Sequence, residues 1–289
     1  MIVITHWDAD GIFCLYLMYK KFGDKFKVYF SSPRSINKTL LKVIENNEKE
    51  EELYVIDIAL NQEAIYLSSY FKKVHWIDHH IITNNIEKTS RVNLYIKPYK
   101  SAARVLAEYL NINSDYLDII DDIDSGEIKN GLEKDFVDMV VGIRYLYPKT
   151  YDIYFISIAK KLLNNRIEDI IDYEIIKKFR KKLNDIFKDL DKNIKIINEK
   201  YKIYIIRMTE NIPSNYILEY IKEKLKDNPD YVITLFENSK RGEIRTLNNK
   251  DVLKIANALG GGGHKHSAGF TFENIQDVYN KLESILNNL

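Results

Sequence analysis

Ile2-Val-Ile-Thr-His6-Trp7-Asp8-Ala9-Asp10-Gly11 joins an apolar run to a group of ionisable residues within the first dozen positions of the chain. The run Ile2–Thr5 is β-branched and almost free of polar residues, which predicts a strand buried on both faces. The following stretch, Gly11–Phe22, has the apolar spacing of a helix. The histidine and the two aspartates therefore lie at the carboxyl end of a strand, where open α/β folds place their binding sites.

The same strand-then-helix pattern continues through the first half of the chain. Further strands are predicted at Phe26–Ser31, Leu53–Ile58 and Val74–Ile77, and a helix at Ile36–Asn46. Alternation of this kind indicates a largely parallel sheet with helices on both faces. We therefore predict an α/β fold whose N-terminal domain, residues 1–165, contains a parallel sheet.

The remainder of the chain predicts a helical linker and a second domain. Residues 166–200 show a helical apolar period with charged residues between and no Gly or Pro, which indicates one long helix or two. Residues 201–289 return to short strands and helices, and we predict a smaller C-terminal α/β domain with a mixed sheet. Its strands are predicted at Tyr201–Met208, Tyr231–Phe236, Gly242–Thr246 and Ala268–Phe272, and its helices at Ile217–Lys226, Lys250–Leu259 and Asp277–Leu286.

Composition excludes several classes of protein. The 289 residues include 43 Lys and Arg against 42 Asp and Glu, a net charge of +1, so the chain cannot coat nucleic acid through bulk positive charge. Its apolar runs are short and broken by charge, and we expect no contact with membrane. The first residues do not resemble a signal peptide, and the single cysteine, Cys14, cannot form an internal disulfide. Both features fit a reducing cytoplasm.

His6, Asp8 and Asp10 stand at alternate positions after the first strand. Side chains of this kind, brought together, repel one another unless a cation binds them. A helix N-cap is the alternative interpretation, but a cap accounts for one aspartate and not for the whole His-x-Asp-x-Asp pattern.

Two more predicted strands end in similar residues. Asp57 follows one apolar strand, and Asp78-His79-His80 follows the next. Asp57 alone could be a turn residue. Imidazole together with carboxylate, however, suits a transition metal such as Mn, Zn, Fe or Co, and recurrence at a third strand end makes chance the poorer explanation.

A fourth acidic segment, Ile120–Gly126, contains Asp121, Asp122 and Asp124. By itself it reads as an acidic helix end and turn. Beside the other three segments, Asp122 becomes our candidate for the last metal ligand, with Asp121 and Asp124 as rivals.

The fifth segment is Gly260–Gly263 followed by His264. Four glycines allow close approach of the backbone to a ligand, and such a loop can direct N–H groups at an anion. Arg245, on a predicted strand upstream, could supply a second anion contact. The alternatives are a flexible loop and an exposed strand arginine.

These segments, in this order, resemble the DHH phosphoesterase family, whose name describes the motif Asp78-His79-His80. The resemblance covers the N-terminal DHH domain and its associated C-terminal domain, here residues 201–289. It implies two Mn²⁺ ions, with other divalent metals as alternatives. The implied ligands are His6 and Asp8 for one ion, Asp10, His79 and Asp122 for the other, and Asp57 as the bridge.

The resemblance also implies roles for residues that do not bind metal. His80 matches the family's histidine on the substrate side, and Asp78 matches a residue that orients its neighbours. The implied substrate-binding positions of the C-terminal domain are Arg245, Gly261, Gly262, Gly263 and His264.

Family members act on several phosphoesters. Our leading hypothesis is a Mn²⁺-dependent exonuclease or phosphodiesterase that hydrolyses ends of single-stranded DNA or RNA or short oligonucleotides, since near-neutral charge disfavours a long electrostatic track. A phosphoesterase acting on a small nucleotide, pAp or a cyclic dinucleotide, is the alternative. A non-catalytic scaffold for replication or repair proteins ranks lower because every expected ligand position carries a usable side chain, and an active enzyme could still bind such partners.

Overall fold

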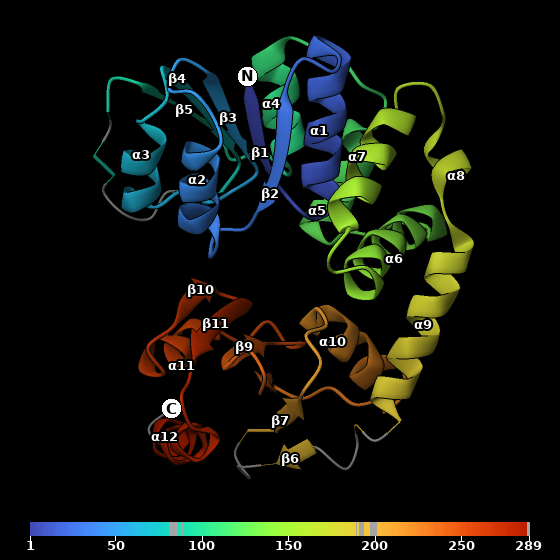
Figure 1. Cartoon of the computed structure of the whole chain (residues 1–289). Coiled ribbons are helices and arrows are strands. Elements are labelled where there is room, and N and C mark those ends of the chain that lie inside the picture. Colours follow the sequence, from blue (N-terminus) through green and yellow to red (C-terminus); the bar gives the residue numbers. More distant parts are fainter. Residues whose placement is uncertain (81–85, 88, 189, 191–193, 197–200, 288–289) are drawn as a thin grey trace. The chain divides into compact units, whose positions relative to one another are not determined.

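The computed structural model describes residues 1–80, 86–87, 89–188, 190, 194–196 and 201–287. Residues Met1–Arg180 and Lys181–Leu289 form two compact units, which Figure 1 colours from blue to yellow and from yellow to red. Each unit has a sheet of its own, and each is described separately below.

The sheet of the first unit is entirely parallel. Its strands follow the order β2-β1-β3-β4-β5. They are β1 (Ile2–His6), β2 (Lys27–Ser31), β3 (Glu52–Ile56), β4 (Lys73–Asp78) and β5 (Val92–Ile96). Strand β1 lies between β2 and β3, and the chain adds β2 on one side of it and β3 on the other, so the carboxyl end of β1 lies at the switch point where such folds bind ligands.

Alternate residues of these strands feed two separate cores. On one face Ile4, Val55 and Trp76 pack against α2 (Ile36–Glu45) and α3 (Gln62–Ser68). On the other face Val3, Ile56 and Ile77 belong to a larger core with α1 (Ala9–Phe22) and α4 (Ala102–Leu110). Figure 1 shows these two helix pairs on opposite sides of the strands. Burial on both faces explains why the strands read as continuous apolar runs.

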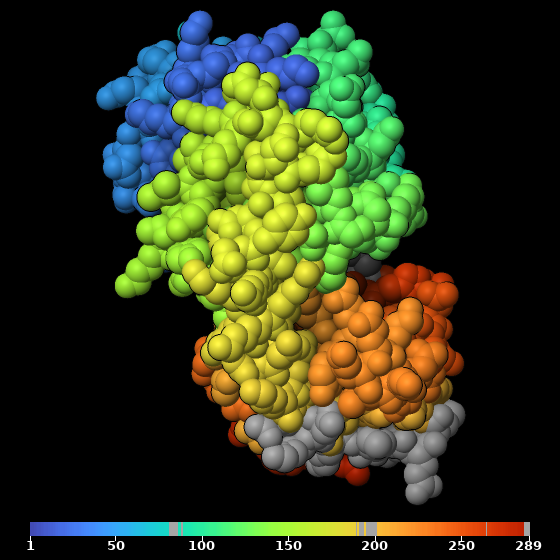
Figure 2. Space-filling model, turned by 90° about the vertical axis from the view of Figure 1, so that its right-hand side faces the viewer, coloured from blue at the N-terminus to red at the C-terminus, as the bar shows by residue number. Residues whose placement is uncertain are grey.

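The helices that follow α4 enlarge the core on the α1 side. They are α5 (Leu117–Ser125), α6 (Gly131–Leu146), α7 (Tyr151–Lys161) and α8 (Ile167–Ile170). Phe13 of α1 lies at the centre of this layer, with its ring centroid 5.3 Å from that of Phe136 on α6. The chain then passes to the second unit through α9 (Tyr173–Phe187), coloured yellow in Figure 2.

The second unit contains a six-stranded mixed sheet of order β10-β11-β9-β8-β7-β6. Its strands are β6 (Ile194–Ile196), β7 (Ile203–Met208), β8 (Tyr231–Phe236), β9 (Arg241–Arg245), β10 (Gly262–His264) and β11 (Ser267–Thr271). Only β7 and β8 pair in parallel. The helices are α10 (Ser214–Glu223), α11 (Leu253–Ala258) and α12 (Ile275–Asn287). Ile255 of α11 and Leu282 of α12 pack on Ile233 and Ile244 of the sheet.

The α/β fold class is confirmed in both units, and each strand predicted there is present to within one or two residues at its ends. The edge strand β5 and the helices α3, α4, α6 and α7 had no counterpart in our predictions, whereas the acidic segment interpreted as a helix end lies at the end of α5. Within the predicted linker, 166–200, lie α8, α9 and the short strand β6, and the boundary between the compact units falls inside α9. Among the described residues no helix combines the length and the apolarity needed to cross a membrane.

Candidate metal centre

Three neighbouring parallel strands end beside one another in the first unit. The register pairs Thr5 with Ile56 and Ile56 with Ile77. His6 is the last residue of β1, Asp57 directly follows β3, and Asp78 ends β4. The strand register thus brings the sequence motifs, far apart along the chain, to one edge of the sheet.

The first group of potential ligands is His6, Asp8 and Asp57, whose ligand atoms all lie within 4.8 Å of one another. His6 Nδ1 is 2.5 Å from Asp8 Oδ2 and 3.8 Å from Asp57 Oδ2. Asp8 is also the N-cap of α1, because its Oδ1 accepts a hydrogen bond of 3.0 Å from the N–H of Gly11. The cap interpretation and the ligand interpretation therefore use different oxygens of one carboxylate, and Asp8 satisfies both.

Glycine is required at position 11 to bring α1 this close to β1. A Cβ at this residue would overlap the carbonyl oxygen of His6. Thr5 Oγ1 also donates a hydrogen bond of 3.0 Å to the carbonyl oxygen of Gly11. The motif glycine thus fixes the first helical turn against the strand end that carries the histidine.

Asp57 lies between the two groups of ligands. Its backbone has φ of 58°, a left-handed conformation uncommon for a residue with a side chain. The residue is 3% exposed, and Oδ2 has no hydrogen-bond partner among the described residues. Since a buried carboxylate oxygen without a partner is costly, strain and an unpaired oxygen at one residue point to a ligand that completes the site.

The second group is Asp10, His79 and Asp124. His79 Nδ1 lies 3.2 Å from the carbonyl oxygen of Tyr99, to which a protonated Nδ1 donates. That contact leaves Nε2 toward the acids, 3.3 Å from Asp124 Oδ2 and 3.8 Å from Asp57 Oδ1. A histidine whose other nitrogen donates to a carbonyl is the usual arrangement of a metal ligand.

Asp124 occupies the place in the cluster that we predicted for Asp122. Asp122 Oδ2 lies 2.7 Å from Lys129 Nζ, and Asp121 binds Ser101 and Arg104. Residues two apart on an α-helix point to nearly opposite sides, so Asp122 and Asp124 cannot both face His79. The fourth acidic segment does reach the cluster, and the geometry of α5 favours Asp124 over Asp122 as its candidate ligand.

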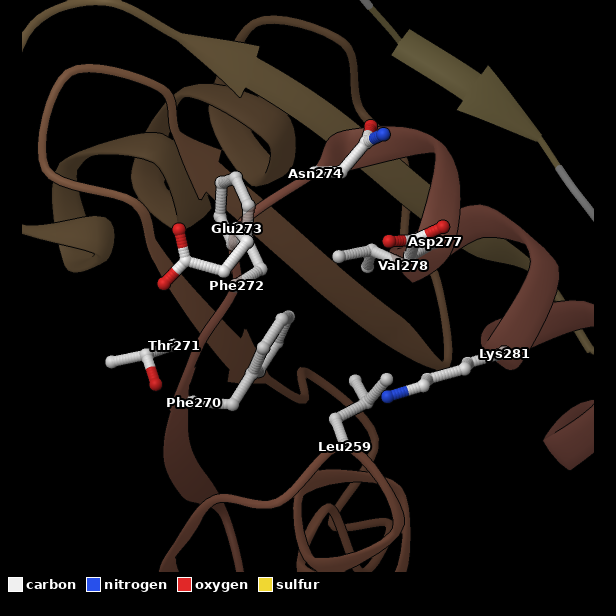
Figure 3. A pocket seen from close by; sticks show the side chains of 9 residues that line it. All are labelled: Leu259, Phe270, Thr271, Phe272, Glu273, Asn274, Asp277, Val278 and Lys281. Atoms are coloured by element: carbon white, nitrogen blue, oxygen red, sulfur yellow. The ribbon is translucent and has the colours of Figure 1, made fainter.

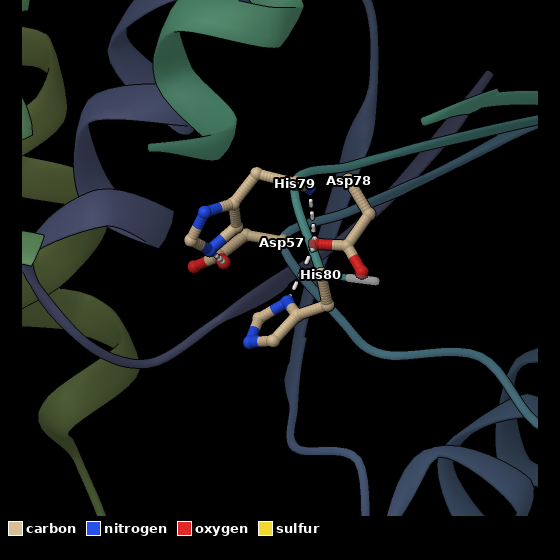
Figure 4. Close-up of side chains that lie close together, drawn as sticks. All are labelled: Asp57, Asp78, His79 and His80. Atoms are coloured by element: carbon tan, nitrogen blue, oxygen red, sulfur yellow. Dashed lines mark hydrogen bonds and ion pairs between the residues drawn. The ribbon is translucent and has the colours of Figure 1, made fainter. Parts of the chain in front are cut away.

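Asp78 connects the two histidines of its motif. Its Oδ1 accepts hydrogen bonds of 2.8 Å from the N–H of His79 and 2.8 Å from Nδ1 of His80, as Figure 4 shows. The carboxylate is 1% exposed, and its Oδ2 has no hydrogen-bond partner among the described residues. The arrangement is that of an orienting group, and it leaves Nε2 of His80 available for another molecule.

Burial, with mutual repulsion, raises the pKa of three acids in the cluster, Asp10, Asp57 and Asp124. Burial raises the pKa of Asp10 and of Asp57 well above the usual range, with neighbouring carboxylates adding to the effect. Burial, then the charge of Asp8, raises the pKa of Asp124 to about 7. For Asp8 burial acts in the same direction, but the charge and hydrogen bond of His6 outweigh it and hold its pKa below the usual range.

The two histidines of the motif shift in opposite directions. Burial and the neighbouring His80 lower the pKa of His79, which favours the neutral form that binds metals. The hydrogen bond to Asp78 raises the pKa of His80. Carboxylates brought together with imidazoles form a donor set that fits divalent transition metals.

In the second unit the glycine segment forms an edge strand, β10, that pairs with β11. Ser267 of β11 pairs with His264 on one side and Arg245 on the other. Nε of Arg245 donates a hydrogen bond of 3.0 Å to Ser214 Oγ. The side chain of His264 lies outside the described part of the structure. The predicted substrate-binding positions thus lie on β9 and β10, the two strands that flank β11, with Gly261 directly before β10.

Close packing explains two of these glycines. A Cβ at Gly261 would overlap the carbonyl oxygen of Gly269, and Gly263 has φ of 149°, which disfavours a side chain. Gly260 has φ of 78° and leads the chain from α11 into the hairpin. The glycine run is therefore needed for strand pairing as well as for any approach of a ligand.

The same unit contains a hollow of about 270 Å³ that the sequence did not indicate (Figure 3). Phe270, Phe272, Leu259 and Val278 form its nearly buried apolar floor, and Lys281 with Asp277 lies at its rim. The described residues that line it include none of the predicted site residues.

Comparison with known proteins agrees with this geometry. Residues 198–289 match the family model of the DHHA1 domain. Among solved structures, the DHH domain of a protein described as a member of a family of ribosomal proteins has a TM-score of 0.69 at 17% identity, over 100% of this chain and 86% of that one. No curated protein matches the sequence.

Two further structures carry functional descriptions. The pGpG-specific phosphodiesterase PggH from Vibrio cholerae has a TM-score of 0.63 at 14% identity, over 99% of this chain and 98% of that one. RecJ from Thermus thermophilus, solved with Mn²⁺, has a TM-score of 0.61 at 13% identity, over 100% of this chain and 52% of that one. The chain thus carries a DHHA1 domain on a DHH-type fold, and the resemblance to the DHH family is confirmed.

Proposed function

We propose that this protein is a metal-dependent phosphoesterase with two divalent ions at the carboxyl edge of its parallel sheet. The observation that carries the proposal is the convergence of His6, Asp8, Asp57, Asp10, His79 and Asp124 into two ligand groups that meet at Asp57. Mn²⁺ is the preferred ion, supported by the mixed imidazole and carboxylate donors and by the Mn²⁺ of the RecJ neighbour.

His6, Asp8 and Asp57 would hold one ion, and Asp10, His79 and Asp124 the other, with Asp57 able to offer one oxygen to each. Two such ions stabilise the attacking and leaving oxygens of a phosphoryl transfer and make hydroxide available near neutral pH. Asp124 takes the position first predicted for Asp122.

The chain's own contribution to the reaction centres on His80 and Asp78. The hydrogen bond to Asp78 raises the pKa of His80 and so favours the protonated form of the ring. A protonated Nε2 can donate a hydrogen bond to a phosphate oxygen and offset its charge. Asp78 fixes the direction of this ring and, through the backbone of His79, that of the neighbouring ligand.

In the second unit we propose that Arg245, Gly261, Gly262, Gly263 and His264 bind the nucleotide part of the substrate. Arg245 offers a guanidinium fork suited to phosphate, and the extended glycine strand offers backbone N–H groups. Ser214, hydrogen-bonded to Arg245, would hold the guanidinium in place.

The substrate class we propose is the end of single-stranded DNA or RNA, or short oligonucleotides. Another similar structure is described as exonuclease RecJ bound to manganese, and a net charge of +1 favours short substrates over long tracts. Docking of replication or repair proteins would be an addition to this activity.

A small nucleotide is the second candidate substrate. It is favoured by the match to PggH, described as pGpG-specific, which extends over 98% of that chain. Hydrolysis of a dinucleotide, pAp or a cyclic dinucleotide alone would place the protein in this group.

The deciding experiment is a cleavage ladder. Internally labelled single-stranded RNA and DNA of two to about twenty nucleotides, which covers typical single-strand site sizes, are incubated with the protein and Mn²⁺, with His79→Ala as the control. Shortening of all lengths, lost in the variant, supports the exonuclease. Cleavage of only the shortest species supports the small-nucleotide enzyme. Failure to cleave any substrate, with Mn²⁺ bound, contradicts the proposal and favours a scaffold.

A further inference from the structure

A buried set of hydrogen bonds joins α4 to α5 beside the candidate metal centre. Ser101, fully buried, is the N-cap of α4, and its Oγ accepts a hydrogen bond of 3.2 Å from the N–H of Arg104. The same hydroxyl donates a hydrogen bond of 2.6 Å to Asp121 Oδ1 on α5. One serine therefore caps the first helix and holds the second.

Arg104 reinforces this connection from α4. Its Nε donates to Asp121 Oδ2, and its Nη2 lies 2.6 Å from Asp118 Oδ1, one turn earlier on α5. The Asp121 side chain is 10% exposed and that of Asp118 is 94% exposed. Water screens the contact with Asp118, so the pair with Asp121 carries most of the connection.

Each of the two helices also fixes the position of one candidate ligand: α4 binds Asp10 of α1, and α5 carries Asp124. The first amides of α4, those of Ala102 and Ala103, donate hydrogen bonds of 2.6 and 2.9 Å to the two oxygens of Asp10. Asp124 lies three residues after Asp121 on α5, and residues at that spacing share a face of a helix. The distance between Asp10 and Asp124 therefore depends on how α4 and α5 are joined.

We propose that Arg104 and Asp121 are positioning residues that set the affinity of the Asp10–His79–Asp124 group for its ion. This inference rests on the proposed function. The other group, His6–Asp8–Asp57, is carried by β1, β3 and α1, and its affinity does not depend on the pair.

The test is a Mn²⁺ titration of the full chain, followed by electron paramagnetic resonance and by calorimetry. Asp121→Ala should lower the affinity for one of the two bound ions by about 10–100-fold, the size of effect known for groups that orient ligands. The affinity for the other ion should change by no more than about threefold. At Mn²⁺ concentrations that saturate the parent, the signal of coupled ions should be lost. Arg104→Lys, which keeps the charge, should restore most of the affinity relative to Arg104→Ala.

Arg180→Gln is the matched control. Arg180 makes a similar double contact, 2.7 Å to Asp135 and 2.7 Å to Asp138, between α9 and α6. The Arg180→Gln variant should leave the affinity for both Mn²⁺ ions unchanged. If Asp121→Ala fails to fold, Asp121→Asn, which keeps the size of the side chain, takes its place.

Two results would overturn the inference. One is a folded Asp121 variant that binds both ions as the parent does, with the coupled signal intact. The other is an equal loss for both ions in the Asp121 and Arg180 variants, which would mark a general loss of structure. A parent protein that binds no Mn²⁺ overturns the proposed function itself and this inference with it.

Discussion

Nε2 of His79 lies 3.3 Å from Oδ2 of Asp124, whereas Asp122, two residues earlier on the same helix, lies 2.7 Å from Lys129 Nζ. The two acids are close in sequence but contact different partners. The contrast provides a direct test of which one binds metal.

We expect Asp124→Asn to lower kcat/KM by at least about 100-fold, more than the loss of an orienting group costs. Asp122→Asn should change it by less than about fivefold, because that carboxylate pairs with the largely exposed Lys129 and lies outside both ligand groups. Steady-state kinetics with saturating Mn²⁺ measures both. Equal losses in the two variants would contradict the assignment.

Gly11→Ala should destabilise the protein by about 1–3 kcal/mol, the usual cost of overpacking, because the new Cβ would overlap the carbonyl oxygen of His6. Gly131→Ala is the control. Residue 131 begins α6, and a Cβ there meets no atom within 4 Å. We expect that variant to be neutral or slightly stabilising, by up to about 1 kcal/mol. Urea denaturation of both variants measures the free energy of unfolding.

The stability of the metal-free protein should fall as pH rises from about 4 to about 7. The pKa of Asp124 is raised to about 7 in the folded state, mainly by burial, against a usual value of 3.8. Such a group stabilises the fold below its unfolded pKa, and that contribution is lost as pH rises through the folded pKa. The raised pKa of Asp57 acts in the same sense.

His79 opposes this trend, since its pKa is lowered by burial and its protonation favours unfolding at acid pH. The carboxylates with raised pKa outnumber this histidine. We therefore expect the midpoint temperature of unfolding, measured in chelator, to decrease as the pH rises from about 5 to about 7.5. Mn²⁺ should restore the midpoint most strongly at the higher pH. A metal-free midpoint that rises across this range would show that the acids do not repel one another.

Asp78→Asn should alter the dependence of the rate on pH. The hydrogen bond to Asp78 raises the pKa of His80, so loss of the carboxylate should move the alkaline limb of the pH–kcat profile to lower pH. His80→Ala should remove that limb and lower kcat by about 100-fold. An alkaline limb that is the same in all three proteins would exclude His80 as its source.

Arg245→Ala should raise KM by about 10–100-fold, the value of a charged hydrogen bond to phosphate, with the Mn²⁺ content unchanged. Arg207→Ala is the control, because Arg207 pairs with Glu237 in the same unit and belongs to no predicted site. A change in kcat without a change in KM would argue against a role in binding.

Residues at the ends of strands could be predicted because the strands themselves can be recognised in the sequence. Apolar runs buried on both faces locate β1, β3 and β4, and parallel strands bring their carboxyl ends to one edge. His6, Asp57 and Asp78 follow from that rule alone. The side chains of His79 and Asp8 then lie near the same edge of the sheet, because these residues come shortly after the strand ends.

Other features depend on tertiary packing. Which of Asp121, Asp122 and Asp124 faces the site depends on the rotation of α5, which its contacts with Ser101 and Arg104 fix. The left-handed backbone of Asp57 has no signature in the sequence. The strand β10 arises from a glycine run with low strand propensity because pairing with β11 outweighs that propensity.

The central claim is that two ions bind at the edge of the parallel sheet, one in each ligand group. Anomalous diffraction from crystals grown with Mn²⁺ tests it most directly. We predict two peaks, one among His6, Asp8 and Asp57 and one among Asp10, His79 and Asp124, with Asp57 next to both. A map with no peak at this edge, or with Mn²⁺ held by Asp122 in place of Asp124, would contradict the account.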